Sequence, residues 1–447
     1  MSKAQQRTQD RFIKQLGTIS ELARKWQQRF TSENGYKEPI GQLLEEFASF
    51  ASDYFGFFLP QNGEGNPKLA YELNTALSNL QNEWAVISRA CEQRHVDAYQ
   101  EQLRKADLQA KNYYDRFKGF KENPAIVPIT YFEKVFEISR YLFTPYPVIS
   151  IPLQVFDNPN EWLALAHELG HFIYWNSPSL EEFNTLHLGL KAIVQETILN
   201  SPNNDSEAKK VIAEIWENWI EEIFADICGT LLTGPKYAVS AQQIVLENNF
   251  ENQEFAFDDE VHPPPYLRPL IALETLQWVA SLLEDGDVKK SLTAQIDQLK
   301  EQWKEVEERG KQEVHQDSGL KMDIIDPYLR LVVWAILGDK TGHKQKTWVD
   351  AKNQPENLGK LFDFTAWLEQ LPGGEPIESL ASTEPISSII SVPFNKLHAH
   401  LEKKYKEKNK IRQALLDWDL SEARSVGTCG NRTVKWVGRG KGYYNRC

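Results

Sequence analysis

A chain of 447 residues is long enough for several domains, and its 41% hydrophobic and 25% charged residues are typical of a globular protein. Its formal net charge of −13 argues against general nucleic-acid binding, because phosphates repel an acidic surface. No segment approaches the roughly 18 consecutive apolar residues of a transmembrane helix, and the polar start does not resemble a signal peptide. We therefore expect a cytoplasmic protein without a membrane span.

The N-terminal part of the chain is predicted to be helical. From about residue 5 to 120, apolar residues recur with helical spacing, with a break at the Pro- and Gly-containing stretch 60–67. We expect an N-terminal helical domain over residues 1–122. A further helical stretch is expected within 121–144, leading into a β-strand at 146–152, whose sequence is YPVISIP.

The next predicted helix contains the run His-Glu-Leu-Gly-His at 167–171. Asn158 is a plausible N-cap, Pro159 suits a first helical turn, and Glu161 stands three residues after the cap, as in a capping box. Apolar residues surround this helix nearly completely, so it should be buried. Its histidines and glutamate then need partners, and a metal ion would be one.

The spacing within this run suits zinc. His167 and His171 are four residues apart and project from one helical face, so they could share a single ion. Two imidazoles leave room on zinc for a third protein ligand and a water. Glu168 stands beside the metal but off the ligand face, where it could take a proton from that water as general base. The alternative is a chance match, with both histidines as ordinary core or surface residues.

A pair of carboxylates lies in a helix predicted over about 208–232. Glu222 and Asp226 are one turn apart and share a face, so Glu222 could complete a His-His-Glu zinc site. Asp226 could then hold a ligand imidazole through its other nitrogen. Glu221 is the competing ligand, but it lies about 100° away from that face, which favours Glu222. A solvated acidic stripe is the alternative, although the helix is apolar on most sides.

A third segment, His-Pro-Pro-Pro-Tyr-Leu-Arg at 262–268, precedes an apolar helix predicted over 270–283. The stiff proline turn would hold His262 where it could donate to the oxyanion of a tetrahedral intermediate. Tyr266 is a second candidate donor, and Arg268 could orient His262 or clamp a substrate carbonyl. Taken alone, the segment is better explained as a loop ahead of a helix.

Together, these three motifs resemble those of gluzincin metallopeptidases. They are most similar to the family of CAAX prenyl endopeptidases and bacterial heat-shock membrane proteases. The resemblance implies three zinc ligands, His167, His171 and Glu222, with Glu168 as the base. It also implies that Asp226 supports a ligand, while His262 and Arg268 stabilise and support the transition state.

The resemblance extends over about residues 145–283 and fits the 51 positions between His171 and Glu222 (222 − 171 = 51). It implies a small sheet in which the strand at 146–152 is the edge strand that binds an extended substrate. Familiar members of the family are embedded in membranes, whereas this chain has no span, so lipidated substrates are not implied. The fold class expected is mainly α, with a zincin-like core flanked by helical domains.

Beyond the catalytic domain expected over 123–285, the chain is again predicted to be helical. A highly charged helix is expected over 287–316, within a C-terminal helical domain over 286–422. The last residues, 423–447, contain six basic and no acidic side chains among aromatic ones. Such a tail could contact nucleic acid or an acidic partner, or form a small β-ribbon on the acidic body.

The function expected is zinc-dependent hydrolysis of peptide bonds in a protein or peptide substrate. The alternative is a non-catalytic scaffold or sensor that keeps a structural zinc and binds regulatory partners through its helical flanks. Glu168 and His262 favour the enzyme, because a purely structural zinc site has no need of a base.

Overall fold

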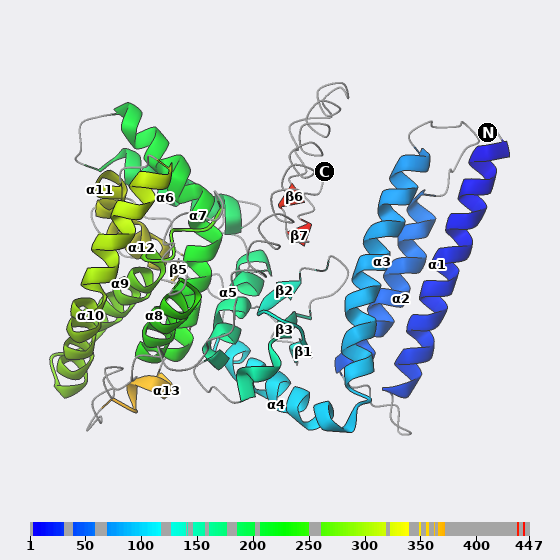
Figure 1. The fold of residues 1–447 in the computed structure, drawn as a ribbon, viewed down its shortest axis with the longest axis horizontal. Helices are drawn as coiled ribbons and strands as arrows, with labels where there is room; N and C mark the ends of the chain where they lie inside the picture. Colours follow the sequence, from blue (N-terminus) through cyan, green and yellow to red (C-terminus); the bar gives the residue numbers. More distant parts are fainter. Residues whose placement is uncertain are drawn as a thin grey trace, which may run out of the picture. The chain divides into compact units, whose positions relative to one another are not determined.

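The protein is mainly α-helical with a small sheet, as the sequence predicts (Figure 1). The structure is a computed structural model. It describes residues 3–30, 39–58, 69–117, 127–139, 141, 146–156, 161–176, 186–201, 206–249, 261–318, 322–338, 348–349, 355–356, 362, 365–371, 436–437 and 441–442.

Helices occur from the start of the described chain to residue 368. They are α1 (Lys3–Arg29), α2 (Pro39–Phe58), α3 (Leu69–Gln93), α4 (Asp97–Tyr114), α5 (Ala164–Asn176), α6 (Leu186–Leu199), α7 (Ser206–Thr233), α8 (Pro235–Asn249), α9 (Leu267–Leu282), α10 (Asp287–Ser318), α11 (Met322–Ile325), α12 (Leu329–Leu337) and α13 (Thr365–Leu368). Short 3₁₀ helices cover Leu153–Phe156, Glu161–Leu163 and Asp326–Tyr328.

The strands are few and short. They are β1 (Ile129–Phe132), β2 (Glu137–Ser139), β3 (Val148–Ile151), β4 (Trp348–Val349), β5 (Pro355–Glu356), β6 (Trp436–Val437) and β7 (Lys441–Gly442). The last four form two antiparallel pairs of two residues each.

The chain divides into two compact units, residues 1–375 and 376–447. The domain boundaries predicted at 122/123 and 285/286 fall inside the first unit. In the second unit the structure describes β6 and β7, a small antiparallel ribbon within the basic tail. The helices expected between residue 372 and the tail lie outside the described residues.

Helices α1, α2 and α3 lie side by side, as Figure 1 shows in blue. The sequence explains this packing, because α2 repeats apolar residues with helical spacing and buries Leu43, Leu44 and Phe47 completely. The same core continues to Ile129 of β1 and Val148 of β3. The helical prediction for this segment is therefore confirmed wherever the structure describes it.

The three-stranded sheet has the order β1-β3-β2, with β1 parallel and β2 antiparallel to β3. Two expectations fail here. The described part of 121–144 forms β1 and β2 instead of a helix, because short apolar runs do not distinguish the two structures. The strand expected at 146–152 exists as β3, but it is central rather than at an edge, and all four of its residues are buried.

The sheet lies next to the helices that carry the motifs. Strand β1 packs against α3 and α4, and the edge strand β2 packs against α5. Helix α5 in turn packs along α7, and α7 is also covered by α6 and α9. The sheet and these helices thus surround the motif helix α5, which is why its central residues are buried.

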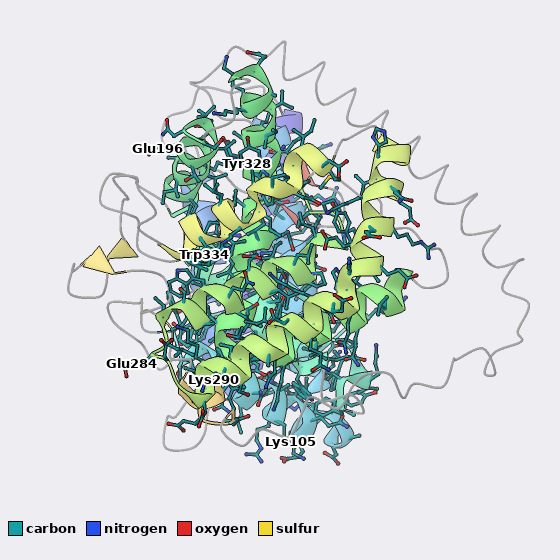
Figure 2. The ribbon with its side chains drawn as sticks, turned by 90° about the vertical axis from the view of Figure 1, so that its left-hand side faces the viewer. Lys105, Glu196, Glu284, Lys290, Tyr328 and Trp334 are labelled. Atoms are coloured by element: carbon teal, nitrogen blue, oxygen red, sulfur yellow. The ribbon has the colours of Figure 1, made fainter. Side chains whose placement is uncertain are left out.

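Helix α9 packs against both α10 and α12, and Figure 2 views these helices face on with Lys290 of α10 and Trp334 of α12 labelled. The predicted charged helix is α10, which begins at the expected Asp287. Its apolar residues Leu292, Ile296, Leu299 and Trp303, spaced four and three apart, are buried, and Val306 is half-buried. Among the described helices, none is both long and apolar enough to cross a membrane.

Candidate metal centre

The candidate site lies where α5 and α7 touch. Gly170 allows this close approach, because a Cβ atom at this position would lie 2.7 Å from Cα of Ala225 in α7. The histidines three residues before and one residue after Gly170 therefore face α7 directly. The expected cap at Asn158 and Pro159 lies outside the described residues, and a 3₁₀ turn at Glu161–Leu163 leads into α5.

His167, His171 and Glu222 come together as a buried cluster in which one potential ligand atom from each lies within 4.8 Å of the others. The Nε2 atoms of the two histidines are 3.1 Å apart. The Glu222 carboxylate lies 3.4 Å from Nε2 of His167 and 3.6 Å from Nε2 of His171. Two imidazoles and a carboxylate that converge in this way could hold a metal ion, and the set matches one found at catalytic zinc sites.

The outer nitrogen of His167 faces a second set of side chains. Its Nδ1 atom lies 3.0 Å from Oδ1 of Asp226, to which the Tyr237 hydroxyl also donates at 2.7 Å. Arg268 donates to both carboxylate oxygens of Asp226, at 3.0 Å from Nε and 2.8 Å from Nη2. This bidentate pair fixes the Asp226 carboxylate against the His167 ring.

The outer nitrogen of His171 has different partners. Its Nδ1 atom lies 3.1 Å from Oε1 of Glu221, and Nε1 of Trp175 donates to the same oxygen at 3.1 Å. Glu221, the competing ligand in the sequence, is therefore placed behind His171, whereas Glu222 faces the Nε2 atoms. The preference for Glu222 at the ligand position agrees with this arrangement.

The segment 262–268 places His262, the residue just before the three prolines, at the open side of the cluster. His262 is 41% exposed at its side chain, and its Nε2 atom lies 3.1 Å from Oε1 of Glu222. Tyr266 does not join the cluster: its fully buried side chain donates its hydroxyl to the Asp326 carboxylate at 3.1 and 3.2 Å. Because the Tyr266 side chain is buried against α10 and its hydroxyl binds Asp326, this hydroxyl does not serve as the oxyanion donor at the cluster.

Glu168 is the remaining motif residue. It is only 7% exposed, and its Oε2 atom has no hydrogen-bond partner among the described residues. A buried carboxylate oxygen without a partner is costly, and such atoms occur where a substrate, water or ion is to be bound. Within the part of the chain that the structure describes, Glu168, the neighbour of His167 in α5, thus has a buried oxygen that can still accept a hydrogen bond.

The electrostatics of the cluster also suit a cation. Burial and Arg268 lower the pKa of His167, but the hydrogen bonds that its ring donates to Asp226 and Glu222 outweigh them and raise it to about 9. Burial raises the pKa of Asp226, whereas Arg268 and His167 lower it to about 2. Two buried carboxylates against one guanidinium leave a negative charge that needs a proton or a metal ion nearby. The residues present therefore fit a divalent metal.

Two contributors were missed by reasoning from the sequence. Trp175 stands four residues after His171, so helical spacing alone could have placed it on the same face. Tyr237 comes from α8, and the sequence indicates its presence at the site only indirectly, through Gly229 of α7. A Cβ atom at Gly229 would lie 2.4 Å from the Tyr237 ring. A glycine inside an apolar helix indicates a close approach but does not name the group that approaches.

Comparisons of the chain with protein-family models, with curated proteins and with solved structures find no match.

Proposed function

We propose that this protein is a zinc-dependent metallopeptidase that cleaves peptide bonds in a protein or peptide substrate. The observation that carries the proposal is the buried His167, His171 and Glu222 cluster with Glu168 beside it. Structural zinc sites are closed by four protein ligands, whereas catalytic ones have three and a nearby base. The resemblance of the three motifs to gluzincin metallopeptidases supports the same proposal.

Each residue has a distinct task in this reaction. The two histidines and Glu222 would hold the zinc ion, which would supply Lewis acidity and lower the pKa of a bound water to about 7. Glu168 takes the proton from the attacking water and later passes it to the leaving amine, which its unpartnered Oε2 atom allows.

The oxyanion needs a donor at the exposed side of the cluster. His262 fits this task, because its ring is partly exposed and already within 3.1 Å of Glu222. The strand that would bind an extended substrate is β2, which is at the sheet edge and packs against α5. We assign this task to β2 instead of the strand at 146–152, because that strand is β3, at the centre of the sheet.

The test combines metal analysis with a peptide library. Wild-type protein should contain about one zinc per chain and cleave library peptides, and a chelator should stop the cleavage. Glu168→Gln should keep the zinc but lose about 10²- to 10⁴-fold in turnover, because only the proton acceptor is removed. His167→Ala should lose the metal. Glu196→Gln on the exposed face of α6 is the matched control and should leave both properties unchanged.

Two outcomes would contradict the proposal. Full zinc occupancy in His167→Ala would show that the metal does not bind at the proposed site. A zinc-loaded wild type that cleaves no library peptide would instead favour a scaffold or sensor.

A further inference from the structure

The two histidines of the cluster are held by different carboxylates. Nδ1 of His167 faces Asp226, whereas Nδ1 of His171 lies 3.1 Å from Glu221. Asp226 cannot serve both rings, because Arg268 and Tyr237 already occupy its oxygens. His171 therefore depends on a separate carboxylate, and that carboxylate comes from the residue next to the ligand Glu222.

We propose that Glu221 is a positioning residue for metal binding, held in place by Trp175, and that it fixes the His171 ring with Nε2 directed at the metal. The inference rests on the zinc site of the proposed function. It concerns metal affinity and coordination, so it is testable apart from catalysis.

The direction of the His171 ring follows from the bonds at both of its nitrogens. An imidazole that ligates a metal through Nε2 must carry its hydrogen on Nδ1. Glu221 Oε1 at 3.1 Å from Nδ1 is at hydrogen-bond distance and accepts that hydrogen. A carboxylate acceptor at this point selects the tautomer and makes the ligating nitrogen more basic.

Trp175 acts on the same pair in two ways. Its indole ring stacks on the His171 ring, with centroids 5.8 Å apart and planes inclined by 27°. Its Nε1 atom donates at 3.1 Å to the Glu221 oxygen that faces His171. The indole thus restrains the His171 imidazole by stacking on its face, and it restrains the Glu221 carboxylate through a hydrogen bond. Rotation of the His171 ring would break its stacking with Trp175 and its hydrogen bond to Glu221.

Glu221 itself is poorly placed to be the metal ligand. Its Oε1 atom already accepts from two donors, and it lies on the Nδ1 side of the His171 ring, away from the Nε2 atoms. The side chain is 21% exposed, against 9% for the Glu222 side chain. Removing the Glu221 carboxylate should therefore loosen His171 without leaving a buried charge that unfolds the chain.

The experiment compares zinc affinity, by competition with a chromophoric chelator, for four variants of the full chain. Glu221→Ala should bind zinc about 10- to 100-fold more weakly, the usual effect of removing a carboxylate behind a histidine ligand. Glu221→Gln should recover most of the affinity, because its amide oxygen still accepts from Nδ1. Trp175→Phe should give a smaller loss, since the stacked ring remains. Glu214→Ala, an exposed position of the same helix, is the control.

Cobalt substitution gives a readout that a general loss of stability would not change. In folded Glu221→Ala, the visible spectrum of bound cobalt should differ from that of the wild type, because the His171 ring is no longer fixed. In Glu214→Ala the spectrum should be that of the wild type. Circular dichroism confirms that each variant is folded.

Three results would overturn the inference. Wild-type zinc affinity and an unchanged cobalt spectrum in Glu221→Ala would show that Glu221 has no role. Complete metal loss in both Glu221→Ala and Glu221→Gln would show that it is a ligand. A wild type that binds neither metal would remove the inference together with the proposed function. Absence of peptidase activity in a metal-binding wild type would count against the proposed function alone.

Discussion

Replacing Gly170 by alanine should damage the proposed metal site more than the fold. The added Cβ would lie 2.7 Å from Cα of Ala225, 3.0 Å from its carbonyl oxygen and 3.0 Å from Cβ of Cys228. The first two are backbone atoms, which no side-chain rotation can move. The clash can be relieved only if α5 and α7 separate locally.

The size of this separation follows from the contact distances. Carbon atoms in contact are about 3.5–4.0 Å apart, so the helices must separate by roughly 1 Å. Overpacking of this kind costs about 1–3 kcal/mol, against which alanine gains about 1 kcal/mol in helix propensity over glycine. The net loss of unfolding free energy should therefore be at most about 2 kcal/mol.

Metal binding is far less tolerant of the same movement. His167 and His171 are on α5 and Glu222 is on α7, so separation of the helices pulls the proposed ligands apart. Bonds from zinc to nitrogen and oxygen are about 2.0–2.2 Å long, and a shift of 1 Å is half that length. We expect zinc affinity to fall on the order of 100-fold or more, which exceeds the usual effect of losing a supporting residue.

The assay measures unfolding by urea in the presence of a chelator, so that metal binding does not contribute to stability, and zinc affinity separately. Gly17→Ala in α1 is the matched control, because a Cβ there meets nothing within 4 Å. It should stabilise the chain by up to about 1 kcal/mol and leave zinc affinity unchanged. Wild-type zinc affinity in folded Gly170→Ala would refute this reasoning.

Two further predictions concern single side chains. If His262 is the proposed oxyanion donor, His262→Ala should lower kcat by about 10²–10³ with KM and zinc content nearly unchanged; steady-state kinetics with normal kcat would contradict this role. Burial raises the pKa of Glu83 from 4.5 to about 7, so the folded chain holds a proton that the unfolded chain releases, and stability falls as pH rises through this window. Glu83→Gln should lack this fall of roughly 3 kcal/mol, and equal pH slopes in urea unfolding of the two proteins would contradict the prediction.

The candidate site was partly predictable because its chemistry is encoded locally. The i, i+4 spacing of His167 and His171 and that of Glu222 and Asp226 place each pair on one helical face without any knowledge of the fold. Contacts between elements are not encoded in this way. The sequence offered both His262 and Tyr266 as oxyanion donors and could not show that Tyr266 lies outside the cluster. Its hydrogen-bond partner Asp326 is 60 positions further along the chain.

The sheet is a second case in which contacts between elements could not be predicted from the sequence. The apolar strand at 148–151 was recognisable, but whether a short strand lies at the centre or at an edge depends on its neighbours. The neighbours here, β1 and β2, come from a segment whose local pattern is equally compatible with a helix. Pairing across the sheet decided between the two structures, and pairing is not visible in a single short window of sequence.

The geometry of helix α7 explains why the adjacent Glu221 and Glu222 have different positions in the site. Successive helical residues point about 100° apart, whereas residues four apart differ by only about 40°. Glu222 and Asp226 therefore lie along one line and reach the two ring nitrogens of His167, at 3.4 and 3.0 Å. Glu221 points to the side and meets His171 from behind, at Nδ1. The angle that disfavours Glu221 as a ligand is the same angle that brings it to the back of the second histidine. One helix can in this way contact both imidazoles on both of their nitrogens, provided that Gly170 keeps α5 close enough.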